Sequence, residues 1–327
     1  MSLLIIRAAE IRELVSMAEC IEVMERAMKA YSANEVTLPP RTIAPLSDDR
    51  SFFILMPGEM QSPAIYGAKI LGLHPDNPQQ GRPAVQGFVA LFDSRTGNPV
   101  ALADGAEITA VRTAAASALA TRVLARPDAA SHGILGTGVQ AASHLDAICC
   151  VRTIRSVSVW GRDQKKAEHF AEQHTGRLDV NITAVADPAE AGACDIVSVV
   201  TNSPKPVLAG SWLQPGAHVN LVGAHEPHER EADTEAVTRS AVYVDSLKGA
   251  LAEAGDILIP IAEGTITRDH IVGAIGDVLL GNAPGRRDQQ QITLYKSLGL
   301  FAQDLYASEF LLEKALRTGK GLSVEFP

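Results

Sequence analysis

The stretch SHGILGTGVQA, residues 131–141, decides the fold class of this chain. A short apolar run leads into a glycine-rich turn, and helix-compatible residues follow it. Gly136, Gly138 and Ala141 match the G-x-G-x-x-G/A pattern of a dinucleotide-binding turn. Gly136 permits the tight turn, Gly138 lets a pyrophosphate approach the backbone, and Ala141 allows close packing of helix on sheet. The N-terminus of the following helix offers unpaired N–H groups to the anion.

Strands and helices alternate after this turn. The strand candidates are His132–Leu135, Ser156–Trp160, Ile182–Val185, Ile196–Val200, His218–Val222 and Ala241–Val244. Such alternation is typical of a parallel sheet with helices on both faces. The predicted fold class is therefore α/β, with a Rossmann-type parallel sheet domain over residues 126–299.

A different kind of segment precedes the turn. Residues 10–33 carry apolar side chains at helical spacing. The strand candidates that follow are Phe52–Met56, ended by Pro57-Gly58, then Ile65–Ile70, Val85–Phe92 and Val100–Leu102. The alanine-rich stretch Ile108–Leu124 contains neither Pro nor Gly and predicts one helix. These elements predict an α+β segment.

The end of the chain is expected to complete this α+β segment. The stretch from about Leu294 to Ala315 is predicted to be helical, and it follows the parallel sheet. If it crosses back onto the first segment, that domain is discontinuous in sequence. We therefore expect one domain made of residues 1–125 and 300–327.

Composition excludes several classes of function. The 327 residues suffice for two domains of ~150 residues. A formal net charge of −9 without a basic tract argues against a nucleic-acid partner. The apolar run after Ser2 is too short for a signal peptide or a membrane span. The four cysteines form no C-x-x-C pair and no zinc-ligand spacing, which predicts a metal-free protein of the reducing cytoplasm.

The end of the second predicted strand bears on the choice of cofactor. Gly161-Arg162 stands where enzymes that prefer NAD(H) usually place an acidic residue. A small residue followed by arginine is more typical of NADP(H) enzymes, since the guanidinium neutralises a 2′-phosphate. Asp163 argues the other way, but its position suits the N-cap of the next helix. NADP(H) is therefore favoured, and NAD(H) remains possible.

A polar cluster follows the fourth predicted strand of this sheet. Thr201 and Asn202 come directly after an apolar strand, at the sheet edge where such folds bind ligands. An ordinary polar loop explains each residue equally well. We predict that both contact the cofactor, together with residues of the glycine turn: Gly136, Thr137, Gly138, Val139 and Gln140.

Three cations stand out in the segment before the turn. Lys69 lies in an otherwise apolar strand candidate, Arg112 lies in the alanine-rich helix, and Arg41 follows two prolines. Taken singly, each is more often a solvated surface residue. Together they would place three positive charges on one domain of an acidic protein, a suitable clamp for a substrate carboxylate.

At this point the chain resembles the ornithine cyclodeaminase/μ-crystallin family. The matching stretches run in order through nearly the whole chain: Gly67–Lys69, Gly72–Asn77, Asp93–Pro99, Ile108–Ala115, Gly136–Ala141, Glu253–Asp256 and Lys296–Leu300. The resemblance implies a discontinuous substrate-binding and dimerisation domain beside a Rossmann domain, homodimers, and NAD(P)-linked chemistry on amino acids or their imines. It implies that Arg112, Lys69 and Arg41 hold the substrate. It also implies that Thr113 contacts the cofactor phosphates.

One departure from the family pattern concerns the reaction itself. In the cyclodeaminases and related alanine dehydrogenases, a catalytic aspartate follows a Gly-Ala pair after the fifth strand. Here His225 follows Gly223-Ala224, and Glu226 is one residue away. The ketimine reductases of the family also lack the aspartate. The departure therefore argues against ornithine cyclodeamination. Separately, we expect Gly223 to contact the cofactor.

The leading hypothesis is an NAD(P)H-dependent reductase of a small cyclic imino acid, such as Δ1-pyrroline-2-carboxylate or Δ1-piperideine-2-carboxylate. Lys69 and His225 are the expected catalytic residues, since histidine exchanges protons near neutral pH. A hydrogen-bonded loop histidine explains His225 nearly as well. The alternatives are an NAD-dependent ornithine cyclodeaminase or amino-acid dehydrogenase, and a non-catalytic, nucleotide-regulated binding protein.

Overall fold

The computed structural model describes residues 2–48 and 50–325 and divides into two compact units. The first unit comprises Met1–Arg112 and Leu300–Pro327, and the second comprises Thr113–Gly299. The chain passes from one unit to the other inside helix α3 (Gly105–Leu124). The domain boundary expected after residue 125 lies at the end of this same helix and stays a prediction.

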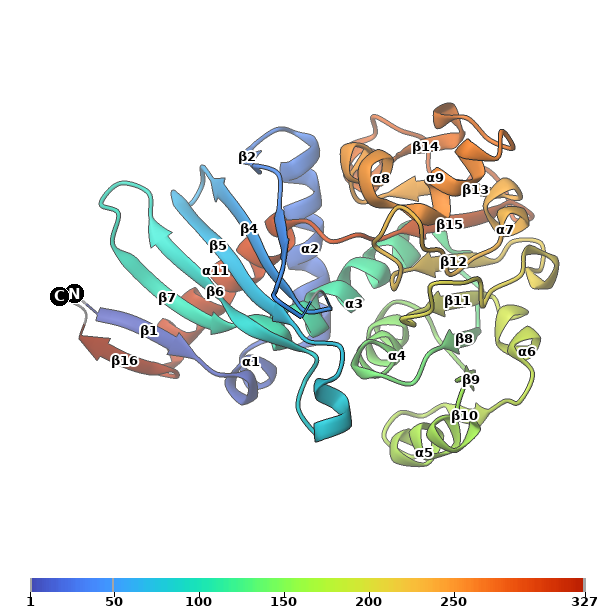
Figure 1. Cartoon of the computed structure of the whole chain (residues 1–327), viewed down its shortest axis with the longest axis horizontal. Helices are drawn as coiled ribbons and strands as arrows, with labels where there is room; N and C mark the ends of the chain where they lie inside the picture. The colour runs from blue at the N-terminus through green and yellow to red at the C-terminus, as the bar shows by residue number, and fades with distance from the viewer. Residues whose placement is uncertain (1, 49, 326–327) are drawn as a thin grey trace. The chain divides into compact units, whose positions relative to one another are not determined.

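A largely antiparallel sheet forms the first unit (Figure 1). Its order is β16-β1-β7-β6-β5-β4-β2, with β3 beside β4. The strands are β1 (Ser2–Ile6), β2 (Val36–Thr37), β3 (Thr42–Pro45), β4 (Phe52–Met60), β5 (Ile65–Leu73), β6 (Val85–Asp93), β7 (Pro99–Asp104) and β16 (Leu322–Glu325). Strand β1 runs antiparallel to β16 and parallel to β7. Both ends of the described chain therefore meet in one sheet.

Helices cover one face of this sheet. They are α1 (Ala8–Leu14), α2 (Met17–Ser32), α11 (Phe301–Thr318) and the start of α3, and a short 3-10 turn, η1 (Asn77–Gln80), precedes β6. Figure 1 shows α11 lying across the strands β4 to β6, which it contacts. Alternate strand residues such as Met56, Val89 and Leu91 point to this side and are buried. Period-two alternation therefore leaves one apolar face for the helices.

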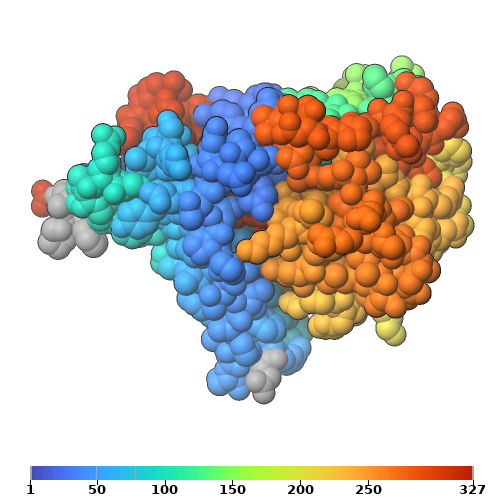
Figure 2. Space-filling view, turned by 90° about the horizontal axis from the view of Figure 1, so that it is seen from above, coloured from blue at the N-terminus to red at the C-terminus, as the bar shows by residue number. Residues whose placement is uncertain are grey.

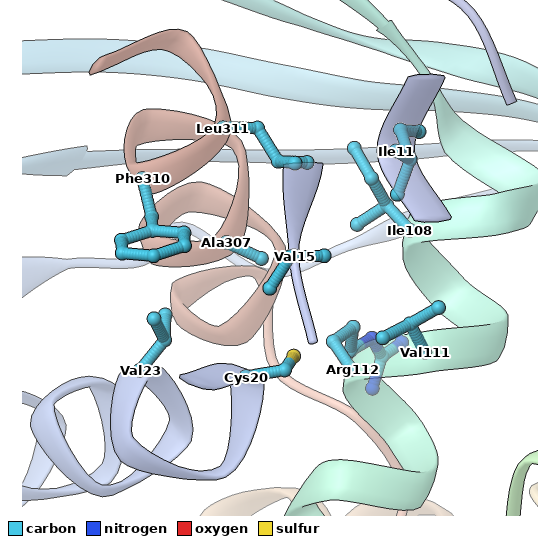
Figure 3. A pocket seen from close by; sticks show the side chains of 10 residues that line it. All are labelled: Ile11, Val15, Cys20, Val23, Ile108, Val111, Arg112, Ala307, Phe310 and Leu311. Carbon is cyan, nitrogen blue, oxygen red and sulfur yellow. The ribbon is translucent and has the colours of Figure 1, made fainter. Parts of the chain in front are cut away.

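A small cavity lies among these helices (Figure 3). Cys20 and Val23 reach it from α2, Arg112 from α3, and Phe310 from α11. Its volume of about 10 Å³ is near the lower limit for one water molecule, so it is too small for a substrate. Burial raises the pKa of the Cys20 thiol to about 12, although the charge of Arg112 opposes this shift. Cys20 is therefore a neutral packing residue.

The opposite face of the same sheet exposes aromatic side chains. Phe53, Tyr66 and Phe88 are 39%, 38% and 41% exposed. Tyr66 stacks on Phe92 with ring centroids 5.0 Å apart. The first unit therefore carries an aromatic patch, defined here as Phe53, Tyr66, Phe88 and Phe92, on a sheet face that its own helices do not cover.

The second unit is built on an entirely parallel sheet of order β10-β9-β8-β11-β12-β15-β13-β14. The strands are β8 (Ser131–Leu135), β9 (Ser156–Trp160), β10 (Asn181–Ala184), β11 (Ile196–Val199), β12 (His218–Leu221), β13 (Ser240–Val244), β14 (Ile271–Ala274) and β15 (Ile292–Lys296). The order reverses direction at β8, as in doubly wound folds. The α/β prediction is confirmed.

Short helices connect the strands of the second unit. They are α4 (Val139–Val151), α5 (Gln164–His174), α6 (Pro188–Gly192), α7 (Thr234–Thr238), α8 (Leu247–Glu253), α9 (Gly255–Ala262) and α10 (Ile275–Leu280), with 3-10 turns η2 (Gly210–Trp212) and η3 (Arg268–His270). The orange segments, which include α8 to α10, form much of the visible face of this unit in Figure 2. No helix among the described residues is both long and apolar enough to cross a membrane.

Two local predictions are wrong. Strand β4 does not end at Pro57 but continues to Met60, because β2 and β3 pair with its two ends and leave Pro57 unpaired on that side. The stretch from Leu294 is not helical at its start, since residues up to Lys296 belong to β15 and the helix begins at Phe301. A fully buried parallel strand is continuously apolar, so its periodicity does not distinguish it from a helix.

Candidate functional site

The glycine turn of the second unit joins β8 to α4. Gly136 has φ +125°, and a Cβ there would lie 2.7 Å from the carbonyl oxygen of Val200. Gly138 is the N-cap of α4, and a Cβ on it would meet no atom within 4 Å. Val139, the first residue of the helix, is 65% exposed. The turn therefore presents open backbone and a helix N-terminus to an anion, as dinucleotide binding requires.

The neighbouring strand end reaches the same turn. A Cβ on Gly161 would lie 2.8 Å from Cγ2 of Thr137, so the two loops are in close contact. Arg162 is exposed beside them. The side chain of Asp163 accepts a hydrogen bond from the backbone N–H of Lys165 at 3.1 Å and caps α5. The N-cap role predicted for Asp163 is confirmed.

A buried carboxylate links the loops that follow β11 and β12. Oε1 of Glu231 accepts hydrogen bonds from the backbone N–H and the hydroxyl of Thr201, both at 2.7 Å. Oε2 accepts from the backbone N–H groups of Gly223 at 2.5 Å and Ala224 at 3.1 Å. A Cβ on Gly223 would lie 1.9 Å from the carbonyl oxygen of Thr201, so only glycine fits there. Asn202, beside Thr201, is exposed.

A buried ion pair lies next to this carboxylate. Lys296 Nζ contacts Asp256 Oδ2 at 2.7 Å, and both side chains are fully buried. The other carboxylate oxygen of Asp256 accepts hydrogen bonds from the backbone N–H groups of Glu231 and Ala232, at 2.8 and 3.0 Å. Lys296 also donates to the carbonyl oxygen of Ala224 at 2.5 Å. We call Glu231, Asp256 and Lys296 the buried charge network.

His225 follows directly on the loop that this network holds. Its side chain is exposed, and its Nδ1 lies 3.0 Å from the carbonyl oxygen of Gly223. That short-range bond fixes one ring nitrogen within the loop. The other nitrogen, Nε2, is therefore the atom through which His225 would exchange a proton with a ligand.

Two of the three predicted cations of the first unit, Lys69 and Arg112, contact the same aspartate. Lys69 Nζ contacts Asp304 Oδ2 at 2.8 Å, and Arg112 Nε contacts Asp304 Oδ1 at 3.0 Å. Arg112 also donates to Oε1 of Gln303 at 2.6 Å. The side chains of Lys69, Arg112 and Asp304 are 2%, 5% and 0% exposed. Strand β5, helix α3 and helix α11 thus place two cations on one buried anion.

This arrangement leaves the cluster with excess positive charge. Burial lowers the pKa of Lys69 to about 8, the Asp304 carboxylate opposes that shift, and the charges of Arg112 and Arg41 lower it further. Arg41 precedes β3 and is half-buried. The three cations predicted from the sequence therefore lie within electrostatic range of one another. Such a cluster attracts a carboxylate, and Lys69 can gain or lose a proton under mild conditions.

Three acidic residues of these sites, Asp304, Glu231 and Asp256, were not predicted, and neither was Lys296. Asp304 lies on α11, far along the chain from Lys69 and Arg112, so no local spacing connects them. The polar pair Gln303-Asp304 within an apolar helix is the signal that could have drawn attention to it. Glu231 lies in an irregular loop without periodicity. Thr113, expected to contact the cofactor, is buried in α3 immediately after Arg112.

The parallel sheet with its glycine turn is the architecture of nucleotide-dependent oxidoreductases, and this protein is an enzyme of that class. Comparison with known proteins defines it more closely. The chain belongs to the ornithine cyclodeaminase/mu-crystallin family, whose model matches residues 2–319. The resemblance noted in the sequence is therefore confirmed.

Three related proteins are similar over essentially their whole length. A Delta(1)-pyrroline-2-carboxylate reductase of Bacillus cereus is 36% identical, covering 99% of this chain and 100% of the relative. The structure of the Thermococcus litoralis Delta(1)-pyrroline-2-carboxylate reductase with NADH and L-proline has a TM-score of 0.95 and 38% identity, covering 98% of this chain and 100% of that chain. An archaeal alanine dehydrogenase dimer with bound NAD has a TM-score of 0.93 and 30% identity, with both chains fully covered.

Proposed function

We propose that this protein is an NAD(P)H-dependent reductase that converts a small cyclic imino acid into the corresponding L-amino acid. Δ1-Pyrroline-2-carboxylate and Δ1-piperideine-2-carboxylate are the proposed substrates. The observation that carries the proposal is the buried cluster of Lys69, Arg112 and Asp304, which combines a carboxylate-binding cation with a lysine of lowered pKa. The substrate named for the Bacillus and Thermococcus relatives supports the same assignment.

The nucleotide fits the second unit. An open helix N-terminus at Gly138 and the exposed loop after β9 suit a pyrophosphate and a ribose. We assign its contacts to Gly136, Thr137, Gly138, Val139, Gln140, Arg162, Thr201, Asn202 and Gly223, and the resemblance adds Thr113. When bound, the nicotinamide supplies the hydride that reduces the imine carbon.

The residues of the chain bind the substrate and handle its proton. Arg112 and Arg41 hold the carboxylate of the imino acid through charge-assisted hydrogen bonds. The ammonium group of Lys69 carries three N–H donors. One donates to Oδ2 of Asp304 at 2.8 Å and a second to Oγ1 of Thr109 at 3.4 Å. Its remaining N–H is proposed to face the imine nitrogen and to protonate it. His225 is proposed to relay a proton during the reaction.

Steady-state reduction tests this function. We expect oxidation of NADPH or NADH, followed by absorbance, when Δ1-pyrroline-2-carboxylate is added, with L-proline as the product. Arg112→Met should abolish turnover, whereas Arg95→Met, which removes an exposed arginine of the β6–β7 turn, should not change it. Ammonia and proline formed from ornithine and NAD would instead identify a cyclodeaminase, and nucleotide binding without any turnover would identify a binding protein.

Oxidative deamination of an amino acid is the second candidate activity. The similarity to the archaeal alanine dehydrogenase favours it, because that enzyme also matches over the whole chain. His225 in place of an aspartate argues for imine reduction. Turnover of pyruvate with ammonia and NADH, measured against Δ1-pyrroline-2-carboxylate in parallel, distinguishes the two.

We propose NADP(H) as the preferred cofactor because of the exposed Arg162 beside the turn. Arg162→Ala should weaken NADPH binding much more than NADH binding. Lys166→Ala removes another exposed cation near the start of α5 and should affect neither. Equal losses for both nucleotides in Arg162→Ala would reject the 2′-phosphate assignment.

We also propose a homodimer of the cytoplasm. The aromatic patch on the open sheet face of the first unit supports the dimer, since exposed apolar side chains gathered on one face can mark interaction sites. The dimeric alanine dehydrogenase points the same way. Four free cysteines are consistent with a reducing compartment.

A further inference from the structure

The loops after β11 and β12 are joined by one side chain. The carboxylate of Glu231 is completely buried and accepts four hydrogen bonds, two from Thr201 and two from the backbone of Gly223 and Ala224. Among the described hydrogen bonds, no other charged side chain contacts both loops. Glu231 therefore sets the spacing between two loops at the carboxyl edge of the parallel sheet.

The rest of the buried charge network fixes Glu231 and the second loop. Asp256 binds the backbone N–H of Glu231 and pairs with Lys296, and Lys296 binds the carbonyl oxygen of Ala224. The peptide groups of Ala224 are thus held on both sides, its N–H by Glu231 and its C=O by Lys296. His225 is the next residue, so its backbone position is determined by two buried side chains.

This network is expensive to bury. Glu231, Asp256 and Lys296 are each 0% exposed and together carry two negative charges and one positive charge. Buried ionic groups of this kind are often less stabilising than apolar residues of similar volume, because both charges lose their hydration. Apart from the hydrogen bond that Asp256 accepts from the backbone N–H of Ala232, the side-chain bonds described for the network end on the two loops or on its own members.

We propose that Glu231, Asp256 and Lys296 are positioning residues that fix the loops bearing Thr201 and Gly223–His225 for nucleotide binding and for the reaction. The proposal rests on the function proposed above, since it assigns those loops to the cofactor. It gives a role to Asp256 and Lys296, which have no other role in the proposed mechanism. We assign Glu231, Asp256 and Lys296, which are 0% exposed, no contact with the reacting atoms.

The protonation of Glu231 gives this network a measurable signature. Burial raises the pKa of Glu231 to about 7, the charge of Asp256 on α9 raises it further, and Lys296 on β15 lowers it. A pKa above that of a solvated glutamate means that the buried arrangement binds the proton more tightly than an open arrangement in which water reaches Glu231. The two loops are therefore held less firmly above pH 7 than below it. Nucleotide affinity should fall as the pH rises through about 7.

Direct binding of NADH, followed by fluorescence between pH 6 and 8.5, tests this. In the wild-type protein the Kd for NADH should rise as the pH rises through about 7. In Glu231→Gln the Kd should be raised about tenfold at pH 8, the scale expected when hydrogen bonds to a buried charge are lost, and should no longer depend on pH. Glu172→Gln, which neutralises an exposed glutamate on α5, should behave as wild type.

Two further measurements separate the possible outcomes. Because His225 lies on the held loop, the pH series is repeated in His225→Asn, where the pH dependence should persist; its loss would assign the effect to His225 and overturn the proposal. Amide hydrogen exchange of the wild-type protein, corrected for intrinsic rates, should show faster exchange of residues 201–203 and 223–226 at pH 8 than at pH 6. This measurement needs no substitution, so it decides the matter even if Glu231→Gln does not fold.

Failure of this inference differs from failure of the proposed function. If NADH binds but no imino acid is reduced, the proposed function fails and the binding data still test the network. If Glu231→Gln folds and binds NADH with wild-type affinity and wild-type pH dependence, the network has no positioning role. Equal exchange of both loops at pH 6 and pH 8 would also reject it.

Discussion

Lys69 is an acid whose strength is set by its surroundings. Burial and the neighbouring arginines outweigh the attraction of Asp304, so the pKa of Lys69 falls from 10.5 to about 8. A lowered pKa means that the lysine loses its charge at lower pH than a solvated lysine does. It is therefore protonated at neutral pH and close to releasing its proton, which suits a general acid.

The reductive reaction should accordingly decline in alkaline solution. If Lys69 donates the proton, kcat/KM for imine reduction should fall as the pH rises through about 8, because the neutral amine cannot act as a general acid. Lys69→Arg keeps the charge up to much higher pH. Its residual activity should therefore lose this inflection. The same inflection in Lys69→Arg would assign it to a different group.

Asp304 holds two cations that would otherwise repel each other. In Asp304→Asn, Lys69 and Arg112 lose their shared carboxylate in a fully buried position. Removal of one partner from a buried ion pair costs about 3–5 kcal/mol of the free energy of unfolding. Denaturant titration at pH 7 measures this loss. Glu13→Gln removes an exposed partner of Lys320 and should cost at most about 1 kcal/mol, so equal losses in the two variants would contradict the argument.

At the scale of single elements, the two glycines of the β8–α4 turn do different work. Gly136 has a positive φ of +125°, and a Cβ on it would meet the backbone of Val200. Gly138 has φ −91°, and a Cβ on it would point into open space. The first glycine serves the fold of the turn. The second leaves room for the ligand.

Alanine substitutions should separate these two roles. Gly136→Ala forces a Cβ against backbone and a φ that alanine rarely adopts, so it should lower the melting temperature, at a cost of about 1–3 kcal/mol. Gly138→Ala should leave the melting temperature of the free protein unchanged and weaken NADH binding at least tenfold, because the new methyl group occupies the approach of the pyrophosphate. Thermal unfolding and NADH titration of both variants provide the check. A large loss of stability in Gly138→Ala would mean that the space at its Cβ is not open.

The elements that the sequence predicted correctly are those with local signals. The glycine turn, the alanine-rich helix α3 and the cap of α5 by Asp163 depend on residues a few positions apart. The sequence of strand β15 does not distinguish it from a helix, because the strand is buried on both faces and shows no alternation. Pro57 reads as a strand end in the sequence, because the pairing of β2 and β3 with the two ends of β4, which leaves Pro57 unpaired on that side, depends on tertiary structure.

The residues of the site divide in the same way. Lys69, Arg41 and Arg112 could be identified as unusual charges in apolar surroundings. Their counter-ion Asp304 could not, since the contact depends on the packing of α11 against strands formed much earlier in the chain. Glu231 is likewise recognised only through the tertiary hydrogen bonds that its carboxylate accepts.

At the scale of the whole molecule, the aromatic patch predicts the oligomeric state. Phe88→Glu places a charge among Phe53, Tyr66 and Phe92 and should convert a dimer into a monomer, which sedimentation velocity measures. Leu316→Glu changes an equally apolar residue, 67% exposed on α11, and should leave the dimer intact. A monomeric wild-type protein would refute the proposed assembly. Dissociation by Leu316→Glu instead would place the interface on a different face.

The topology of the first unit has a consequence for the order in which the molecule can become active during its synthesis. Strand β1 pairs with β16 at the far end of the sequence, and Asp304 lies on the last helix. A growing chain that has already emerged past Lys69 and Arg112 holds both cations without their anion until residue 304 has been made. The residues of the second unit, which end at residue 299, are also made before Asp304. A chain interrupted before residue 304 therefore lacks the counter-ion that Lys69 and Arg112 share.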